Sequence, residues 1–253
     1  MSTFVIVHGA FGGGWEWTRV ARILRDQGHD VWTPTLTGLG DRAHLAHRGV
    51  GLSTHIRDVL ALLELEDLRR VVLCGASYGG MPVTGAADGA PERVAGVVYV
   101  DALVPRDGQS ALDLLPASFR ASVAARSRSR ARGAWNVPVP LQVLPPRGGI
   151  PDERWSHYVS RLVPQPAATF SDAIRLTGAV DGLPRGFVRC TGSNLENDPI
   201  ERIATRIRKR RWPYREIEAP HDPHLFDPLG TARIILRLSR ELRGRQPRGP
   251  RSA

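Results

Sequence analysis

The run Gly75-Ala76-Ser77-Tyr78-Gly79-Gly80 lies between the most apolar stretch of the chain, 70–74, and a stretch of helical periodicity over 78–88. It fits the pattern G-x-S-x-G, in which small residues on both sides of the serine permit a tight strand-to-helix turn. Such a turn lifts the serine hydroxyl above the sheet, at the positive end of the following helix. A plain glycine-rich turn could carry the same letters, so the prediction of Ser77 as a nucleophile depends on the rest of the chain.

On both sides of this run, apolar segments bounded by turn residues alternate with segments of helical periodicity. The alternation predicts an α/β fold, a mostly parallel sheet with helices on both faces. Ser53 is the expected cap of the second helix. Strands are expected over 4–7, 29–34, 70–74, 94–100, 186–190 and 214–217, and helices over 17–27, 53–63, 78–88, 199–208 and 229–242.

The alternation breaks from about Pro105 to about Leu183, where prolines are scattered and 126–132 is a basic tract. We expect this segment, 105–183, to form a cap inserted into an α/β core made of 1–104 and 184–242. Residues 243–253 have the glycine-, proline- and arginine-rich composition of a flexible basic tail.

Composition is that of an ordinary globular chain, with 253 residues of which 42% are hydrophobic and 24% charged. There is no apolar run of about 18 residues and no signal-peptide pattern at the N-terminus, so neither a membrane span nor secretion is expected. Cys74 and Cys190 each lie in an apolar run, as buried thiols do, and a disulfide scaffold is excluded. The expected location is the cytoplasm.

The net charge of +10 raises the question of a nucleic-acid partner. Lys209 is the one lysine among 35 basic residues, so 35 − 1 = 34 are arginine, and they are dispersed along the chain. A basic surface indicates nucleic-acid binding only when its charges gather on one face or motif. We attribute the arginine bias to a GC-rich bacterial coding sequence and expect no nucleic-acid partner.

A serine hydroxyl needs a neighbouring base, because alone it is a weak nucleophile. In folds with this turn the catalytic residues follow the order serine, acid, histidine. Only His221 and His224 come after the last expected strand, 214–217. His221 is the first to leave the last strand and is the predicted base, whereas His224, about one turn further on, is expected to pack.

The acid that orients the histidine has several candidates. Glu196 and Asp198 both follow the strand expected over 186–190. Asp198 precedes Pro199 and is equally well explained as a helix cap, so Glu196 is preferred. Asp101 or Asp107, after the preceding strand, is a third possibility, and all of these remain open.

An acyl-transfer site also needs donors for the oxyanion. The glycine-rich run 8–14 follows the first strand, and we expect the backbone N–H groups of Ala10 and Tyr78 to donate hydrogen bonds to the oxyanion. The run lacks the spacing of a phosphate-binding loop, and there is no H-E-x-x-H motif or Cys/His cluster, so neither a metal nor an organic cofactor is expected. The expected substrate pocket is lined by Phe11, Trp135, Trp155 and Tyr158.

Taken together, these residues resemble the α/β-hydrolase superfamily, in the branch of plant methyl-ester esterases, hydroxynitrile lyases and related bacterial esterases. The resemblance is carried by 4–10, by 34–42, and by the serine turn together with Val100-Asp101-Ala102. The lyases have a threonine and a lysine at the positions of Gly9 and Asp222, so the resemblance implies ester hydrolysis. In the plant members an aspartate soon after a Cys-Thr pair is the acid, and Gly192-Ser193 follow that pair here.

We therefore expect a serine hydrolase that cleaves a small carboxylic ester through an acyl-enzyme. Lactone or thioester hydrolysis, or intramolecular acyl transfer by a biosynthetic cyclase, would use the same chemistry. A non-catalytic small-ligand-binding relative of this fold is the alternative outside enzymes. The expected partner is a small ester, with no membrane contact, and a homodimer is left open.

Overall fold

The computed structural model describes residues 1–128, 135–140, 144, 150–192 and 199–244, and it contains a six-stranded parallel sheet. All five strand pairs are parallel, so the carboxyl ends of the strands meet at one edge of the sheet. This confirms the expected α/β fold. The strand order is β2 (Asp30–Trp32), β1 (Thr3–Val7), β3 (Val71–Ala76), β4 (Val94–Val100), β7 (Arg185–Cys190) and β8 (Tyr214–Ile217).

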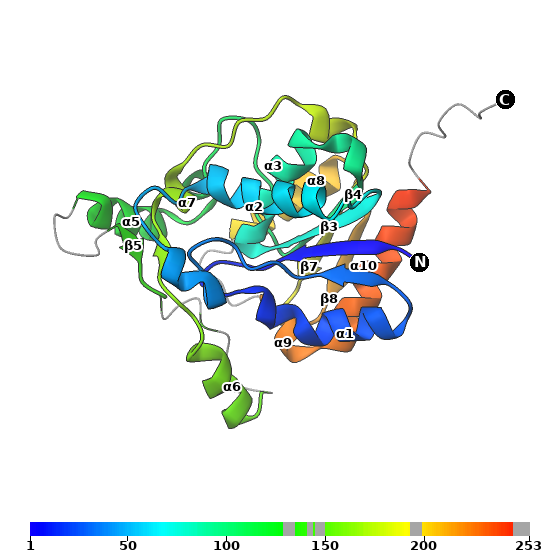
Figure 1. Cartoon of the computed structure of the whole chain (residues 1–253), viewed down its shortest axis with the longest axis horizontal. Coiled ribbons are helices and arrows are strands. Elements are labelled where there is room, and N and C mark those ends of the chain that lie inside the picture. The colour runs from blue at the N-terminus through cyan, green and yellow to red at the C-terminus, as the bar shows by residue number, and fades with distance from the viewer. Residues whose placement is uncertain (129–134, 141–143, 145–149, 193–198, 245–253) are drawn as a thin grey trace.

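Helices cover both faces of this sheet (Figure 1). On β3, Val71 and Leu73 belong to one apolar cluster, and Val72 and Cys74 belong to the other, as the pleat of a strand buried on both faces requires. One face is covered by α2 (Leu52–Leu65), α3 (Gly80–Gly89) and α8 (Pro199–Lys209), and the other by α1 (Thr18–Asp26) and α10 (Pro228–Arg243).

The start of α2 corrects one expectation. Its cap residue is Gly51, whereas Ser53 lies inside the first turn. Thr54 Oγ1 accepts a hydrogen bond from Gly51 N–H at 3.3 Å, and Asp172 Oδ2 accepts one from Leu52 N–H at 3.1 Å. The carboxylate of Asp172, about 120 residues away along the chain, therefore satisfies the first free N–H group of the helix, which begins before Ser53.

Between β4 and β7 the chain leaves the sheet, and this is the segment expected to form the cap (Figure 1). Buried side chains of this segment, among them Val123, Val137 and Phe170, join the same apolar cluster as Tyr78 and β3. The packing seats the segment over the edge at which the strands end. Its elements are α4 (Ala111–Leu114), α5 (Ala117–Arg128), β5 (Asn136–Val137), α6 (Asp152–Val159), β6 (Gln165–Pro166) and α7 (Ala168–Ser171).

None of the helices in the described ranges is long and apolar enough to cross a membrane.

Candidate active site

Ser77 occupies a sharp turn between β3 and α3. Its φ of 50° lies in the left-handed region, which a residue other than glycine rarely adopts. The neighbouring glycines are required by space, because a Cβ on Gly75 would lie 2.6 Å from the Gly79 carbonyl oxygen and one on Gly79 would lie 2.5 Å from that of Val7. The strained turn therefore holds the Ser77 hydroxyl at the end of β3, where the sequence analysis expects it.

Two hydrogen bonds connect Ser77 to a histidine and a carboxylate. Ser77 Oγ lies 2.8 Å from His221 Nε2, and His221 Nδ1 lies 2.7 Å from Asp101 Oδ2. His221 belongs to the loop between β8 and α9 (Pro223–Phe226), and Asp101 directly follows β4. With Nδ1–H donating to the carboxylate, Nε2 is free to accept the proton of Ser77, which is the arrangement of a base-activated nucleophile.

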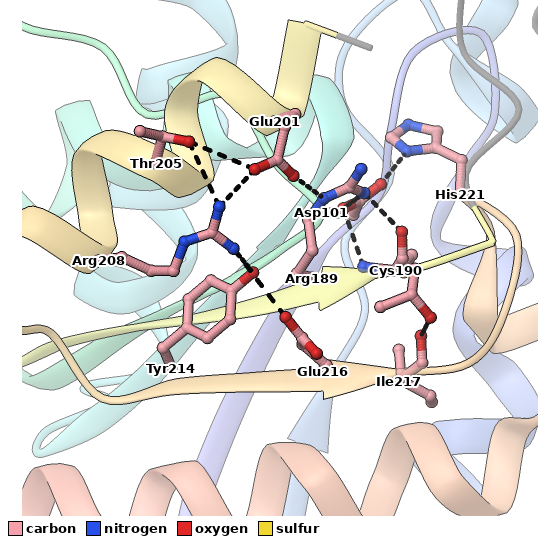
Figure 2. Close-up of polar contacts among 11 residues, drawn as sticks. Asp101, Arg189, Cys190, Glu201, Thr205, Arg208, Tyr214, Glu216, Ile217 and His221 are labelled. Atoms are coloured by element: carbon pink, nitrogen blue, oxygen red, sulfur yellow. Dashed lines mark hydrogen bonds and ion pairs between the residues drawn. The ribbon is translucent and has the colours of Figure 1, made fainter.

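Asp101 is fully buried, and β7 fixes its position (Figure 2). Its Oδ1 accepts hydrogen bonds from Arg189 Nη1 at 2.7 Å and from Cys190 N–H at 3.0 Å. Its own N–H donates to the Val188 carbonyl at 2.7 Å, and its φ is 44°. Strand β7 therefore holds Asp101 in two ways, through its backbone N–H and through its carboxylate oxygen Oδ1.

The electrostatic surroundings of His221 raise its pKa overall. Burial alone lowers the pKa of an imidazole, but the hydrogen bond and the negative charge of Asp101, with a further contribution from Asp222, outweigh it. Asp222 is partly buried beside His221, and desolvation raises the pKa of its carboxyl. Burial raises the pKa of Glu16 well above its usual value, and both carboxyls face the cavity described next.

Ser77 and His221 lie in the wall of a cavity of about 250 Å³. Much of the wall is apolar, and His221 is the only basic side chain among the lining residues that the structure describes. The volume suits a small organic ligand. The apolar side chains in the wall include Phe11, Leu103, Leu115, Phe119, Leu162, Phe170 and Ile200, and the polar ones include Glu16, Ser118, Ser122, Tyr158 and Asp222.

The expected pocket residues divide into two groups. Phe11 and Tyr158 line the cavity, as do the two residues expected to bind the oxyanion, Ala10 and Tyr78. Trp135 and Trp155 are not among its described lining residues. Trp135 instead accepts a hydrogen bond from Ala167 N–H through its carbonyl, so its backbone helps to join β5 to the residues after β6.

The candidate acids also divide. Asp101 is the one that the structure brings to His221. Asp107 is exposed, and its Oδ1 accepts a hydrogen bond from Leu176 N–H at 2.8 Å. Glu196, the preferred residue, and Asp198 lie outside the described residues.

Three other histidines, His8, His55 and His224, are buried away from Ser77 Oγ and contact other parts of the core. His224 is buried and stacks on Trp17 with the ring centroids 4.5 Å apart, and burial lowers its pKa to about 3. His8 Nε2 accepts a hydrogen bond from Leu36 N–H at 3.1 Å. His55 Nδ1 lies 2.9 Å from the hydroxyl of Tyr78, which helps to hold the residue after the nucleophile in place.

Sequence reasoning did not find Glu16 or Arg189. Glu16 lies two residues after the glycine-rich run 8–14, and Arg189 is the one charged residue in the stretch 186–190, which is otherwise free of polar side chains. A charge at such a position is a signal, because buried charges occur where a partner meets them. Among the described residues no group of three or more His, Cys, Asp or Glu could hold a metal ion.

The chain is similar in sequence and in structure to known hydrolases and esterases. The model of the alpha/beta hydrolase family matches residues 4–234. A carbendazim hydrolyzing esterase from a Nocardioides species is 41% identical over 186 residues, which cover 70% of this chain and 75% of the relative. Methylesterase 18 of Arabidopsis thaliana is 27% identical over 214 residues, covering 78% and 81% of the two chains. A solved extracellular alpha/beta-hydrolase from a Paenibacillus species superimposes with a TM-score of 0.81 at 22% identity, over 94% of this chain and 99% of the other.

Proposed function

The chain belongs to the alpha/beta hydrolase family and is a carboxylic ester hydrolase, and we propose that it acts through a Ser77 nucleophile, a His221 base and an Asp101 acid. The observation that carries the proposal is the pair of hydrogen bonds, 2.8 Å from Ser77 to His221 and 2.7 Å from His221 to Asp101, in the wall of a cavity. This connectivity is what a serine needs to become a nucleophile at neutral pH.

The reaction proceeds in two halves. Ser77 Oγ attacks the ester carbonyl while its proton passes to His221 Nε2, and the new oxyanion accepts hydrogen bonds from the N–H groups of Ala10 and Tyr78. His221 returns the proton to the departing alkoxide, which leaves as the alcohol. Water then attacks the acyl-enzyme with His221 again as base, and the acid is released from Ser77. Asp101 stabilises the imidazolium that forms in each half.

The proposed substrate is a small, uncharged ester. Apolar walls favour an uncharged ligand, and an anionic ester would meet the carboxyls of Glu16 and Asp222 without a lysine or arginine among the described lining residues. The relative at 41% identity is named for the hydrolysis of carbendazim, so carbendazim is the first compound to assay. Nitrophenyl esters, aryl methyl esters, lactones and thioesters complete the panel.

A bacterial, cytoplasmic setting is part of the proposal. It is supported by the arginine bias and by Cys74 and Cys190, which are both buried and free, as expected where thiols stay reduced.

Covalent labelling tests the acyl-enzyme directly. Mixing the protein with a nitrophenyl ester and quenching during the first turnover is expected to leave the mass of one acyl group on the peptide that contains Ser77. The release of nitrophenol should show a burst of about one equivalent per enzyme if deacylation is the slower half. Acylation of a peptide without Ser77, or hydrolysis in which no acylated peptide forms under any quench, would contradict the proposed mechanism.

The pH dependence follows from the surroundings of His221. The histidine must be neutral to accept the serine proton, so kcat/KM is expected to fall as the pH falls through the pKa of His221 in the free enzyme. Because that pKa is raised, the midpoint of the acidic limb should lie above the ordinary histidine value of about 6.5. A kcat/KM profile on an uncharged ester measures it. A limb at or below that value would contradict the raised pKa, and a profile without an acidic limb would contradict the assignment of His221 as base.

A further inference from the structure

Arg189 is a buried arginine in β7, on the far side of Asp101 from His221 (Figure 2). We propose that Arg189 is a positioning residue of the hydrolytic site, which holds the Asp101 carboxylate so that Oδ2 faces His221. The inference rests on the proposed function, since it assigns to Arg189 a task that exists only if Asp101 orients the base.

The contacts of Asp101 show how the orientation is fixed. A carboxylate can rotate about its Cβ–Cγ bond unless its two oxygens have different, well-placed partners. Here Oδ1 accepts from Arg189 Nη1 at 2.7 Å and from Cys190 N–H at 3.0 Å, which leaves Oδ2 facing His221 Nδ1 at 2.7 Å. The charged donor supplies the stronger of the two bonds to Oδ1.

Burial explains why the donor carries a charge. Asp101 has no exposed surface, and an ionised carboxylate removed from water is costly unless a charge and hydrogen bonds compensate it. The side chain of Arg189 is 7% exposed, and the same Nη1 also donates to the Cys190 carbonyl at 2.5 Å. Arg189 is thus tied to the end of β7 while it pairs with Asp101.

Arg189 is itself held from outside. Its Nε lies 3.3 Å from Oε2 of Glu201 in α8. Arg208, nearly two helix turns further on, pairs with the other oxygen of Glu201 and with the hydroxyl of Tyr214 (Figure 2). Arg189 is not among the described residues that line the cavity. Its influence on the reaction must therefore pass through Asp101 and not through contact with substrate.

The charge of Arg189 also acts on His221. The groups that face this imidazole in the described part of the chain are Asp101 after β4, Arg189 in β7, Asp222 in its own loop and His224 in α9. Asp101 and Asp222 raise the pKa of His221, whereas the positive charge of Arg189 lowers it. Removing that charge should move the acidic limb of the pH profile upward, which loss of packing alone would not do.

The test is Arg189→Gln, which removes the charge and keeps a polar side chain. We expect kcat on a nitrophenyl ester to fall at least about tenfold with KM changed less than about threefold, because the lost charge-assisted bond orients the base. The acidic limb should move upward, because the positive charge that lowers the pKa of His221 is gone. In an Asp101→Asn background the same substitution should cost less than about threefold, because coupled residues are not additive.

Two further variants keep the test decisive. Arg189→Lys retains the charge, so its kcat should stay within about tenfold of the wild type and the acidic limb of its pH profile should not move. If Arg189→Gln does not fold, Arg189→Lys tests the inference in its place. Arg208→Gln alters the same network without contact to Asp101 and should leave kcat and the pH profile as in the wild type. A wild-type rate and profile for Arg189→Gln, full additivity with Asp101→Asn, or a shifted limb in Arg189→Lys would overturn the inference.

Failure of this inference can be told from failure of the proposed function. Ser77→Ala and Asp101→Asn are measured first, without any change at Arg189. If either keeps the wild-type rate, the proposed mechanism fails whatever Arg189 does. If both lose activity and Arg189→Gln does not, only the role of Arg189 is refuted.

Discussion

Ser77→Ala is expected to lower kcat by about ten-thousandfold to a millionfold on any ester that the enzyme turns over. Without the hydroxyl no acyl-enzyme can form, and the remaining rate comes from water in a site that still binds substrate and stabilises the oxyanion. Since alanine keeps the Cβ and removes only Oγ, the strained turn at φ 50° and its neighbours should be unaltered. KM should therefore change little.

The measurement is steady-state hydrolysis of a nitrophenyl ester, with thermal unfolding followed in parallel. Ser122→Ala is the matched control, because Ser122 also contributes to the cavity wall but has no described contact with His221. Its kcat should stay within about threefold of the wild type, as expected for a residue outside the reacting group. Equal rates for Ser77→Ala and the wild type would show that the hydrolysis does not use this serine.

The fold could be predicted from the chain because its decisive signals are local. The strands expected over 94–100 and 214–217 have those bounds in the structure, and the turn at Ser77 joins β3 to α3 as the pattern G-x-S-x-G requires. An apolar run buried on both faces, and a turn so tight that a Cβ on Gly75 would clash with the Gly79 carbonyl, are properties of a few adjacent residues. Ser53 is not the cap because α2 begins before it, at Leu52, whose N–H group donates to Asp172 from a distant segment.

The acid shows where local reasoning ends. Chain order places the acid in the loop after 186–190, and capping of the next helix by Asp198 leaves Glu196 as the residue that local reasoning predicts. The contact between His221 and Asp101 depends on the strand order, in which β4 lies between β3 and β7. The spatial order of the strands cannot be read from the sequence, so Asp101 is only an alternative to Glu196 in the sequence-based prediction of the acid.

The cavity was harder to predict than the residues that react. Residue type alone predicts all three aromatic residues of the expected cap as pocket residues, yet Tyr158 lines the cavity and Trp135 and Trp155 are not among its described lining residues. Which face of a short helix or two-residue strand meets the core depends on packing between segments. Glu16 illustrates the same limit, because its carboxylate reaches the cavity only through the fold of the residues after β1.

Asp101→Asn is expected to lower kcat by about a thousandfold to ten-thousandfold. The amide removes the negative charge that stabilises the imidazolium, and its NH2 group can face Nδ1 and hold the imidazole in the tautomer that cannot accept the Ser77 proton. Asparagine has nearly the size of aspartate, so the backbone bond from Asp101 N–H to Val188 should persist. KM should change much less than kcat.

The comparison that decides the acid sets Asp101→Asn beside Glu196→Gln and Asp198→Asn, all assayed at one pH. If Asp101 orients His221, the substitutions Glu196→Gln and Asp198→Asn should change kcat by less than about tenfold, because only one carboxylate orients the catalytic histidine. The pH profile separates the same alternatives, since Asp101 raises the pKa of His221 and its neutralisation should move the acidic limb downward, opposite to the shift expected for Arg189→Gln. A thousandfold loss in Glu196→Gln, with Asp101→Asn near the wild-type rate, would instead assign the acid to the loop after β7 and leave Asp101 with a purely structural role.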